Sequence, residues 1–199
     1  TTGSGLLSYG DHTLGINFLS LNKAESAILT GARDGTARVL DYPSLSEITI
    51  FTGHASSVNC GVINSESGYC ITGGNDDRVI LWDLSSGSYI RDFDDHSVNV
   101  TAIEANSDFS LCASGDKSGN IYTYNPMDMS SIDSYSLGSS EVRRLIFSDD
   151  GNRLLAVFAD GEIYSIDLNS KTSSLLNSVT EGLEYAVLHP SGRYLFYIS

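Results

Sequence analysis

The sequence predicts an all-β fold made of repeated four-stranded units. The residues that close four successive apolar runs recur every 42 positions: Asp41, Asp83, Asn125 and Asp167. Three histidines keep the same interval: His12, His54 and His96. Each unit contains four short runs rich in apolar and β-branched residues, and no segment has a helical period. A period in the forties with four strands per unit is typical of a β-propeller, in which each unit folds as one blade.

The strand pattern keeps its register from unit to unit. The first strand of each unit carries a β-branched apolar residue in one column: Ile16, Val58, Val100 and Val142. The second strand carries adjacent apolar residues, which predicts a strand covered on both faces. The fourth strand is shorter and more polar, which is typical of an outer edge strand. We therefore expect a single domain over residues 1–199, with repeats at approximately 10–51, 52–93, 94–135 and 136–177 and a partial repeat at 178–199.

Apolar runs near both ends of the chain predict partial blades. Residues 6–9 align with the outer strand at residues 48–51, and residues 194–198 align with the second strand of a fifth unit. The sequence thus predicts four complete four-stranded blades plus two partial blades. A ring of about seven such blades needs roughly 290 residues, so we expect a fragment of such a ring. The alternative is a five-bladed ring in which residues 6–9 close against the final strands.

The composition limits the kinds of partner. The chain has 11 basic and 25 acidic residues, and this balance disfavours direct nucleic-acid binding, whose affinity comes from clustered Lys and Arg. No run is long and apolar enough to cross a membrane, so no membrane insertion is expected. Three cysteines, Cys60, Cys70 and Cys112, lack CxxC spacing. They predict buried thiols in a reducing compartment, with a disulfide or a metal site as the alternatives.

The second unit carries three motifs that resemble those of a known family. They are Gly53-His54, Gly73-Gly74-Asn75-Asp76 and Leu81-Trp82-Asp83. Together with the period of 42, which runs through nearly the whole chain, they make the sequence resemble the WD-repeat propellers. The resemblance implies that a His, a strand Ser or Thr, a turn Asp and a Trp form a hydrogen-bonded tetrad that ties each blade together.

The tetrad positions are filled to different degrees in the four units. The second unit has the full set: His54, Thr72, Asp76 and Trp82. The first unit has His12, Thr30 and Asp34, with Leu40 in place of Trp. The third has His96 and Ser114, with Ser118 in place of Asp and Tyr124 in place of Trp. The fourth keeps only Asp160, with Gly138 in place of His. Because a catalytic site occurs once and this set recurs, we expect it to be structural.

The resemblance also implies a partner-binding top face. It implies that the fifth residue after the His position of each unit lies at the mouth of the central channel, which selects Asn17, Asn59, Thr101, Arg143 and Glu184. It also implies a second column on this face, the residue before the turn Asp position of each unit: Arg33, Asn75, Lys117 and Ala159. The two columns hold three cations against one acid. Arg supplies paired donors to carboxylates and phosphates, so the face predicts an acidic or phosphorylated peptide as the partner.

The sequence offers no convincing catalytic set. The channel column holds one carboxylate, whereas glycosidases need a converging pair. The HExxH, phosphate-loop and GxSxG motifs are absent. We therefore expect no catalytic residue, metal, cofactor or small-molecule substrate. With no catalytic set in view, the resemblance implies a protein-interaction scaffold in a multiprotein complex of the eukaryotic cytoplasm or nucleus, bound to peptide segments or complex subunits. The alternatives are a purely architectural subunit that assembles through blade edges and sides and, more remotely, a propeller hydrolase.

Overall fold

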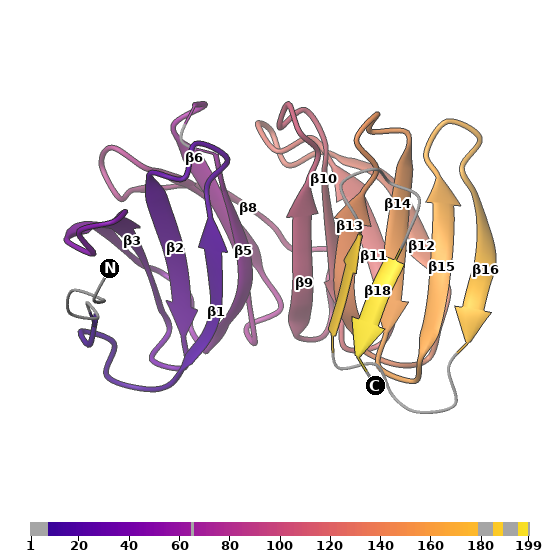
Figure 1. Cartoon of the computed structure of the whole chain (residues 1–199), viewed down its shortest axis with the longest axis horizontal. Helices are drawn as coiled ribbons and strands as arrows, with labels where there is room; N and C mark the ends of the chain where they lie inside the picture. Colours follow the sequence, from indigo (N-terminus) through magenta and orange to yellow (C-terminus); the bar gives the residue numbers. More distant parts are fainter. Residues whose placement is uncertain (1–7, 65, 179–184, 189–194, 199) are drawn as a thin grey trace, which may run out of the picture.

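The computed structural model describes residues 8–64, 66–178, 185–188 and 195–198 of the chain. These residues form four four-stranded antiparallel sheets and one two-stranded sheet (Figure 1). Within each large sheet the strands pair in chain order. The all-β fold class predicted from the sequence is confirmed. The described residues include no helix that could span a membrane.

The strands follow the 42-residue period closely. The first sheet contains β1 (Ile16–Leu21), β2 (Ala27–Ala32), β3 (Thr36–Asp41) and β4 (Glu47–Thr52). The second contains β5 (Val58–Asn64), β6 (Tyr69–Gly74), β7 (Val79–Asp83) and β8 (Tyr89–Phe93). The third contains β9 (Val100–Ala105), β10 (Cys112–Asp116), β11 (Asn120–Tyr124) and β12 (Ser131–Ser136). The fourth contains β13 (Val142–Phe147), β14 (Arg153–Phe158), β15 (Glu162–Asp167) and β16 (Thr172–Ser178).

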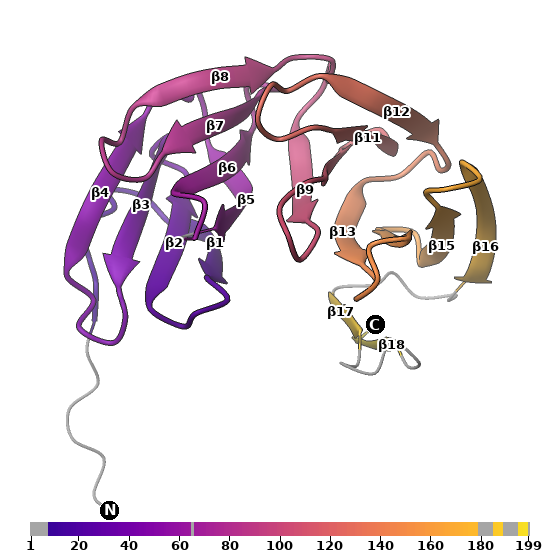
Figure 2. The same ribbon diagram turned by 90° about the horizontal axis from the view of Figure 1, so that it is seen from above.

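The four sheets stand as blades around an arc. Seen from above, the inner strands β1, β5, β9 and β13 line its concave side, and the outer strands β4, β8, β12 and β16 lie on its convex side (Figure 2). The β17 (Tyr185–Leu188) and β18 (Leu195–Ile198) strands pair antiparallel, as expected for the first two strands of a fifth unit. This arrangement is that of a partial β-propeller.

The outer strand expected at residues 6–9 falls partly outside the described residues. The two described positions, Ser8 and Tyr9, are not in a strand. The Tyr9 hydroxyl instead donates to Glu47 and accepts from Arg38, so Tyr9 lies beside β3 and β4. An outer strand pairs with a third strand, and the described residues hold no third strand ahead of the first blade. This prediction is wrong for the two described positions.

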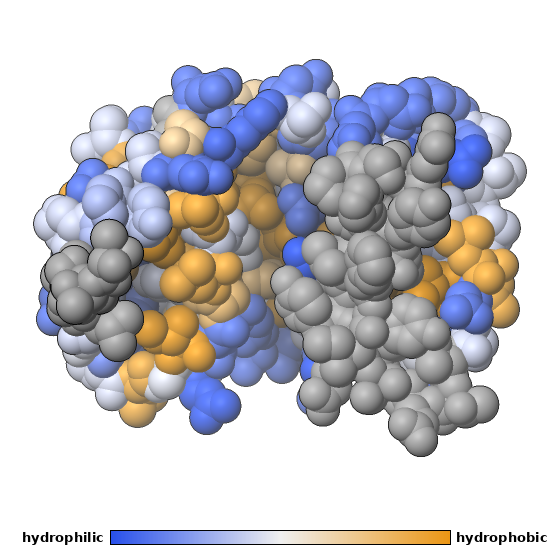
Figure 3. Space-filling view, in the orientation of Figure 1, coloured by the Kyte–Doolittle hydropathy of each residue, from blue (hydrophilic) through white to orange (hydrophobic). Residues whose placement is uncertain are grey.

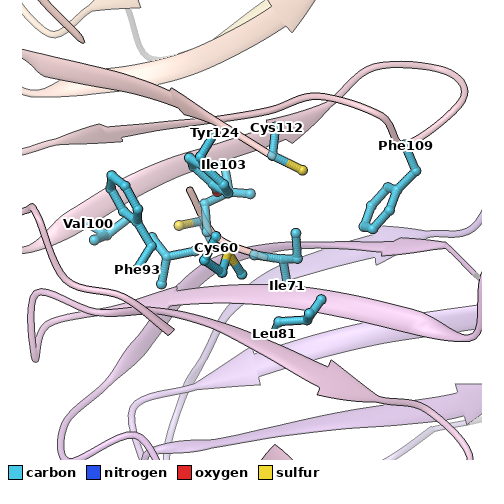
Figure 4. Close-up of a cluster of buried hydrophobic side chains, with 11 residues drawn as sticks. Cys60, Ile71, Leu81, Phe93, Val100, Ile103, Phe109, Cys112 and Tyr124 are labelled. Atoms are coloured by element: carbon cyan, nitrogen blue, oxygen red, sulfur yellow. The ribbon is translucent and has the colours of Figure 1, made fainter. Parts of the chain in front are cut away.

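The core lies between successive blades. One cluster joins the second and third blades and includes Cys60, Ile71, Ile103 and Tyr124 (Figure 4). An outer-strand aromatic residue packs against the third strand of the next blade in two places. The Phe93 and Tyr124 rings stack with centroids 4.8 Å apart, and the Phe51 and Trp82 rings lie 5.2 Å apart. Face-to-face packing of this kind buries both faces of each second strand, as the sequence pattern predicts.

The first blade has an uncovered apolar face. Figure 3 shows apolar side chains gathered over β1, where Ile16 is 50% and Leu19 65% exposed. Val58, Val100 and Val142 occupy the position of Ile16 in the later blades and are fully buried, because a preceding blade covers them. The exposure of the β1 face therefore follows from its place at the end of the arc.

The three cysteines lie in the buried strands β5, β6 and β10 and form no disulfide. Burial raises the pKa of Cys60, Cys70 and Cys112, so these thiols stay protonated at neutral pH. They behave as small apolar side chains in the core.

Candidate functional site

The inner strands of the four large sheets each have a β-bulge at the same repeat position. The pairing of β1 with β2 skips Asn17, and the pairing of β5 with β6 skips Asn59. The β9 and β13 strands skip Thr101 and Arg143 in the same way. A bulge gives one strand an extra residue and re-aims its side chain. The bulges therefore direct the channel-mouth column toward the top of the arc.

Three of the bulge side chains join adjacent blades. Each donates to the carbonyl oxygen of the first residue of the next inner strand: Asn17 to Val58 at 2.9 Å, Asn59 to Val100 at 2.9 Å and Thr101 to Val142 at 2.7 Å. A carbonyl oxygen only accepts, so the amide nitrogens of Asn17 and Asn59 must face these oxygens. The channel-mouth column thus has a structural role in addition to any role in binding.

The top face contains a cavity of about 500 Å³. It brings together seven of the residues expected on the partner-binding face: Asn17, Arg33, Asn59, Asn75, Thr101, Lys117 and Arg143. Two further residues, Asn99 and Glu141, also line it. Glu184 was expected on the same face and lies outside the described residues.

Amide side chains close the cavity wall between the second and third blades. Asn75 Oδ1 accepts from Asn59 Nδ2 at 2.6 Å and from Asn99 Nδ2 at 2.8 Å. The Val100 carbonyl fixes the orientation of Asn59, and Asn59 in turn fixes that of Asn75. Hydrogen bonds link these three amide side chains, so this part of the wall is uncharged and held together.

The three cations of the cavity differ in their contacts. Arg33 Nε donates to Asn17 Oδ1 at 3.4 Å. Arg143 Nη1 lies 3.6 Å from a carboxylate oxygen of Glu141, and the Arg143 side chain is 48% exposed. The Lys117 ammonium group makes no hydrogen bond or ion pair with any other residue that the structure describes. Lys117 is therefore the cation most available to an incoming anion.

The tetrad of the second blade forms one continuous hydrogen-bonded chain. Trp82 Nε1 donates to Thr72 Oγ1 at 2.8 Å, and the Thr72 hydroxyl lies 2.8 Å from His54 Nε2. His54 Nδ1 lies 2.9 Å from Asp76 Oδ1. Trp can only donate and the carboxylate only accepts, so the Thr72 hydroxyl accepts from Trp82 and His54 Nδ1 donates to Asp76. In the first blade, His12 contacts Asp34 at 3.1 Å and Thr30 at 2.9 Å, and Leu40 adds no polar group.

The third blade takes its carboxylate from an unexpected position. Ser118 was expected in place of the turn Asp, but His96 Nδ1 lies 3.1 Å from Asp116 Oδ2 and its Nε2 lies 2.7 Å from Ser114 Oγ. The expectation for Ser118 is wrong because Asp116 occupies the repeat position of Gly74. A Cβ at Gly74 would lie 2.7 Å from Asp76 Oδ1, so an acid fits at only one of the two positions.

The fourth blade replaces the polar tetrad with apolar contacts. The same repeat position now holds Phe158, which is fully buried and meets Tyr164 with ring centroids 5.6 Å apart. Gly138 stands where the other blades have His, and a Cβ there would lie 2.9 Å from the Phe158 ring. Asp160, expected as a tetrad residue, only accepts from the Glu162 amide within its turn. It caps the hairpin and joins no tetrad.

A family model described as WD domain, G-beta repeat, matches residues 3–41 and 45–83. The first part of the chain therefore contains two WD repeats. The second matched repeat begins just before β4 and ends at the last residue of β7, so a WD repeat is offset by one strand from a blade. A search of curated proteins found no match. WD repeats generally mediate contacts between proteins and are generally non-catalytic.

The carboxylates of Asp76 and Asp116 stay ionised at neutral pH. Burial alone would raise the pKa of Asp76, but the hydrogen bond and charge of His54 outweigh it and hold that pKa below its usual value. The pKa of Asp116 is also lowered, because hydrogen bonds from His96 and Asn120 outweigh burial. Each carboxylate is occupied by partners within its own blade. Within the described part of the chain, no group of three or more His, Cys, Asp or Glu could hold a metal ion.

The two cavity residues missed from the sequence share a repeat position. Asn99 and Glu141 each directly precede an inner strand, and they are 42 residues apart. The resemblance to WD-repeat propellers supplied two columns of the top face and left this third column unmarked. The period itself was the signal that could have found it, since both residues flank the strand that carries the bulge.

Proposed function

We propose that this protein is a non-catalytic scaffold within a multiprotein complex. In this proposal an acidic or phosphorylated peptide segment of a partner binds the top face. The observation that carries it is the composition of the cavity: Arg33, Lys117 and Arg143 line it with one carboxylate, Glu141, on a chain of net charge −14. A cationic cavity on an acidic body attracts an anion at one place and repels it elsewhere.

The cavity also suits a peptide in size and rigidity. Its volume of about 500 Å³ is within the range of small-ligand pockets, so it accommodates one or two side chains. The hydrogen bonds from Asn17, Asn59 and Thr101 to the next blade hold its wall in place. A wall fixed before binding reduces the entropy lost when a partner docks. Arg143 offers two parallel donors to a carboxylate or phosphate.

The second candidate is an architectural subunit that assembles through blade edges and sides. One observation favours it: β16 is exposed along its whole length, with Leu175 and Leu176 at 50% and 57%. An exposed outer strand with apolar side chains can pair with another chain. A hydrolase lacks such support, because the cavity has one carboxylate and an Arg lies beside it. We place the protein in the cytoplasm or nucleus, which agrees with three buried free thiols.

Peptide binding by charge variants separates the two candidates. The probe is a fluorescein-labelled hexaglutamate peptide, and its anisotropy reports binding. The variant Arg33→Ser/Lys117→Ser/Arg143→Ser is expected to abolish binding while the melting temperature stays within a few degrees. The outer-strand variants Thr49→Lys and Arg91→Glu are the controls and are expected to bind like the parent. Binding retained by the triple variant and lost in the outer-strand variants would reject the top face.

A further inference from the structure

The top face is built from three columns that recur at each junction between blades. At the first junction they are Asn17, Arg33 and Ser57, at the second Asn59, Asn75 and Asn99, and at the third Thr101, Lys117 and Glu141. The backbone amide of Asn75 donates to Ser57 O at 2.9 Å, and that of Lys117 donates to Asn99 O at 3.0 Å. The junctions thus have the same backbone, and they differ in their side chains.

The second junction is closed to an added anion. Asn75 Oδ1 accepts two amide donors, and all three side chains of the junction are neutral. The first junction is partly closed, because Arg33 Nε already donates to Asn17, and its three residues supply a single cation.

The third junction, taken together with Arg143 on the next inner strand, has two cations and one carboxylate. Lys117 occupies the position of Asn75, and Glu141 occupies the position of Asn99. Glu141 lies 3.6 Å from Arg143 rather than bonding across the junction, and the Thr101 hydroxyl donates to Val142 O. Lys117 and Arg143 line the same cavity, and Glu141, which pairs with Arg143, is the one carboxylate among its lining residues.

We infer that the third junction is the anchor site for one oxyanion of the partner, held between Lys117 and Arg143 with Glu141 as a built-in competitor. The inference rests on the proposed function and narrows it to one place on the face. The oxyanion is a side-chain carboxylate or a phosphate monoester, since both accept from an ammonium and a guanidinium group. Glu141 competes because it occupies one side of the Arg143 guanidinium. Its negative charge weakens the binding of any anion at the junction, so only a strongly charged oxyanion displaces it.

Single variants with two defined peptides test this inference. One labelled probe is hexaglutamate, and the other is a neutral hexapeptide with one phosphoserine. For Lys117→Gln and Arg143→Gln we expect a rise in Kd of about tenfold or more, as for the loss of a charge-assisted hydrogen bond. For Arg33→Gln we expect a rise of less than about threefold. Glu141→Gln is expected to lower Kd by about threefold to tenfold. Arg153→Gln, an exposed Arg outside the top face, is the control for net charge.

The outcomes separate this inference from the proposed function. The peptide that shows the expected pattern identifies the oxyanion as carboxylate or phosphate. Equal losses of peptide affinity for Arg33→Gln and Lys117→Gln would overturn the third junction as the anchor site, but would still agree with binding at the top face. Unchanged or weaker binding by Glu141→Gln would overturn its role as competitor. If neither the single variants nor the triple variant reduced peptide binding, the proposed function would be overturned as well. Melting temperatures near that of the parent establish that each variant is folded.

Discussion

His96 Nδ1 lies 3.1 Å from Asp116 Oδ2, and both side chains are fully shielded from solvent. This pair reproduces the imidazole–carboxylate contact of the first two blades with an acid from a different repeat position. Gly74 has that position in the second blade, where His54 and Asp76 leave no room for a Cβ. The buried hydrogen bond is therefore what these blades share, and the position of the acid is free to change.

Asp116→Ala is expected to lower the free energy of unfolding by about 1–3 kcal/mol. The reason is that His96 and the backbone amides of Ser118 and Asn120 lose their acceptor. Urea unfolding followed by the fluorescence of Trp82 measures the change. Ser118→Ala is the matched control, with an expected loss under about 0.5 kcal/mol. Equal midpoints for the two variants would contradict the role of Asp116.

Asp76→Ala is expected to destabilise the second blade by about 1–3 kcal/mol, because His54 and the Ala55 amide lose their partner. Asp160 occupies the same repeat position in the fourth blade but bonds only within its turn. Asp160→Ala is therefore expected to cost much less. Differential scanning calorimetry of the two variants checks the contrast, and a melting temperature for Asp76→Ala equal to that of the parent would refute the tetrad.

Stability is expected to fall at acid pH. The pKa values of Asp34, Asp76 and Asp116 are all lowered in the folded chain. A lowered folded-state pKa means that the unfolded chain binds more protons as pH falls. The ionised carboxylates therefore contribute fully to the free energy of unfolding above about pH 4, and this contribution is lost as the pH drops through their folded-state pKa values. Asp116→Asn removes one such group, so its free energy of unfolding should fall less steeply than that of the parent between about pH 4.5 and 2.5. If the free energies of unfolding of the parent and of Asp116→Asn fell in parallel with pH, Asp116 would not be ionised in the folded chain.

Asn59→Ala is expected to lower the free energy of unfolding by about 1 kcal/mol. The Val100 carbonyl loses its donor from the preceding blade, and Asn75 Oδ1 loses one of its two amide donors. Ser139→Ala, at an exposed position, is the control. Hydrogen exchange at residues of β9 offers a local readout. Unchanged protection there, with an unchanged unfolding midpoint, would show that the bulge side chains do not join the blades.

The repeat made most of the fold predictable. An interval of 42 and apolar columns such as Ile16 and Val58 place strands without reference to any three-dimensional contact. Steric conflicts between two repeat positions leave no such pattern in the sequence. The second blade has Gly74 and Asp76 where the third has Asp116 and Ser118. The reason is that a Cβ at Gly74 would lie against His54 and Asp76, and only the folded blade shows this contact.

The candidate face was predictable in part for a related reason. Bulge residues such as Asn59 and Arg143 belong to columns that the family resemblance marks. Asn99 and Glu141 lie in loops, and their roles depend on side chains that reach another blade or another charge. Such contacts leave no apolar period in the sequence, so pattern reasoning passed over them.

The salt dependence of peptide binding tests the top-face proposal most directly. The measurement is the Kd of labelled hexaglutamate at low and high NaCl, for the parent and for Arg33→Ser/Lys117→Ser/Arg143→Ser. We expect tight binding by the parent at low salt, a loss of affinity of about tenfold or more at high salt, and negligible binding by the triple variant at either salt concentration. A Kd that is independent of salt and equal in the two proteins would contradict it.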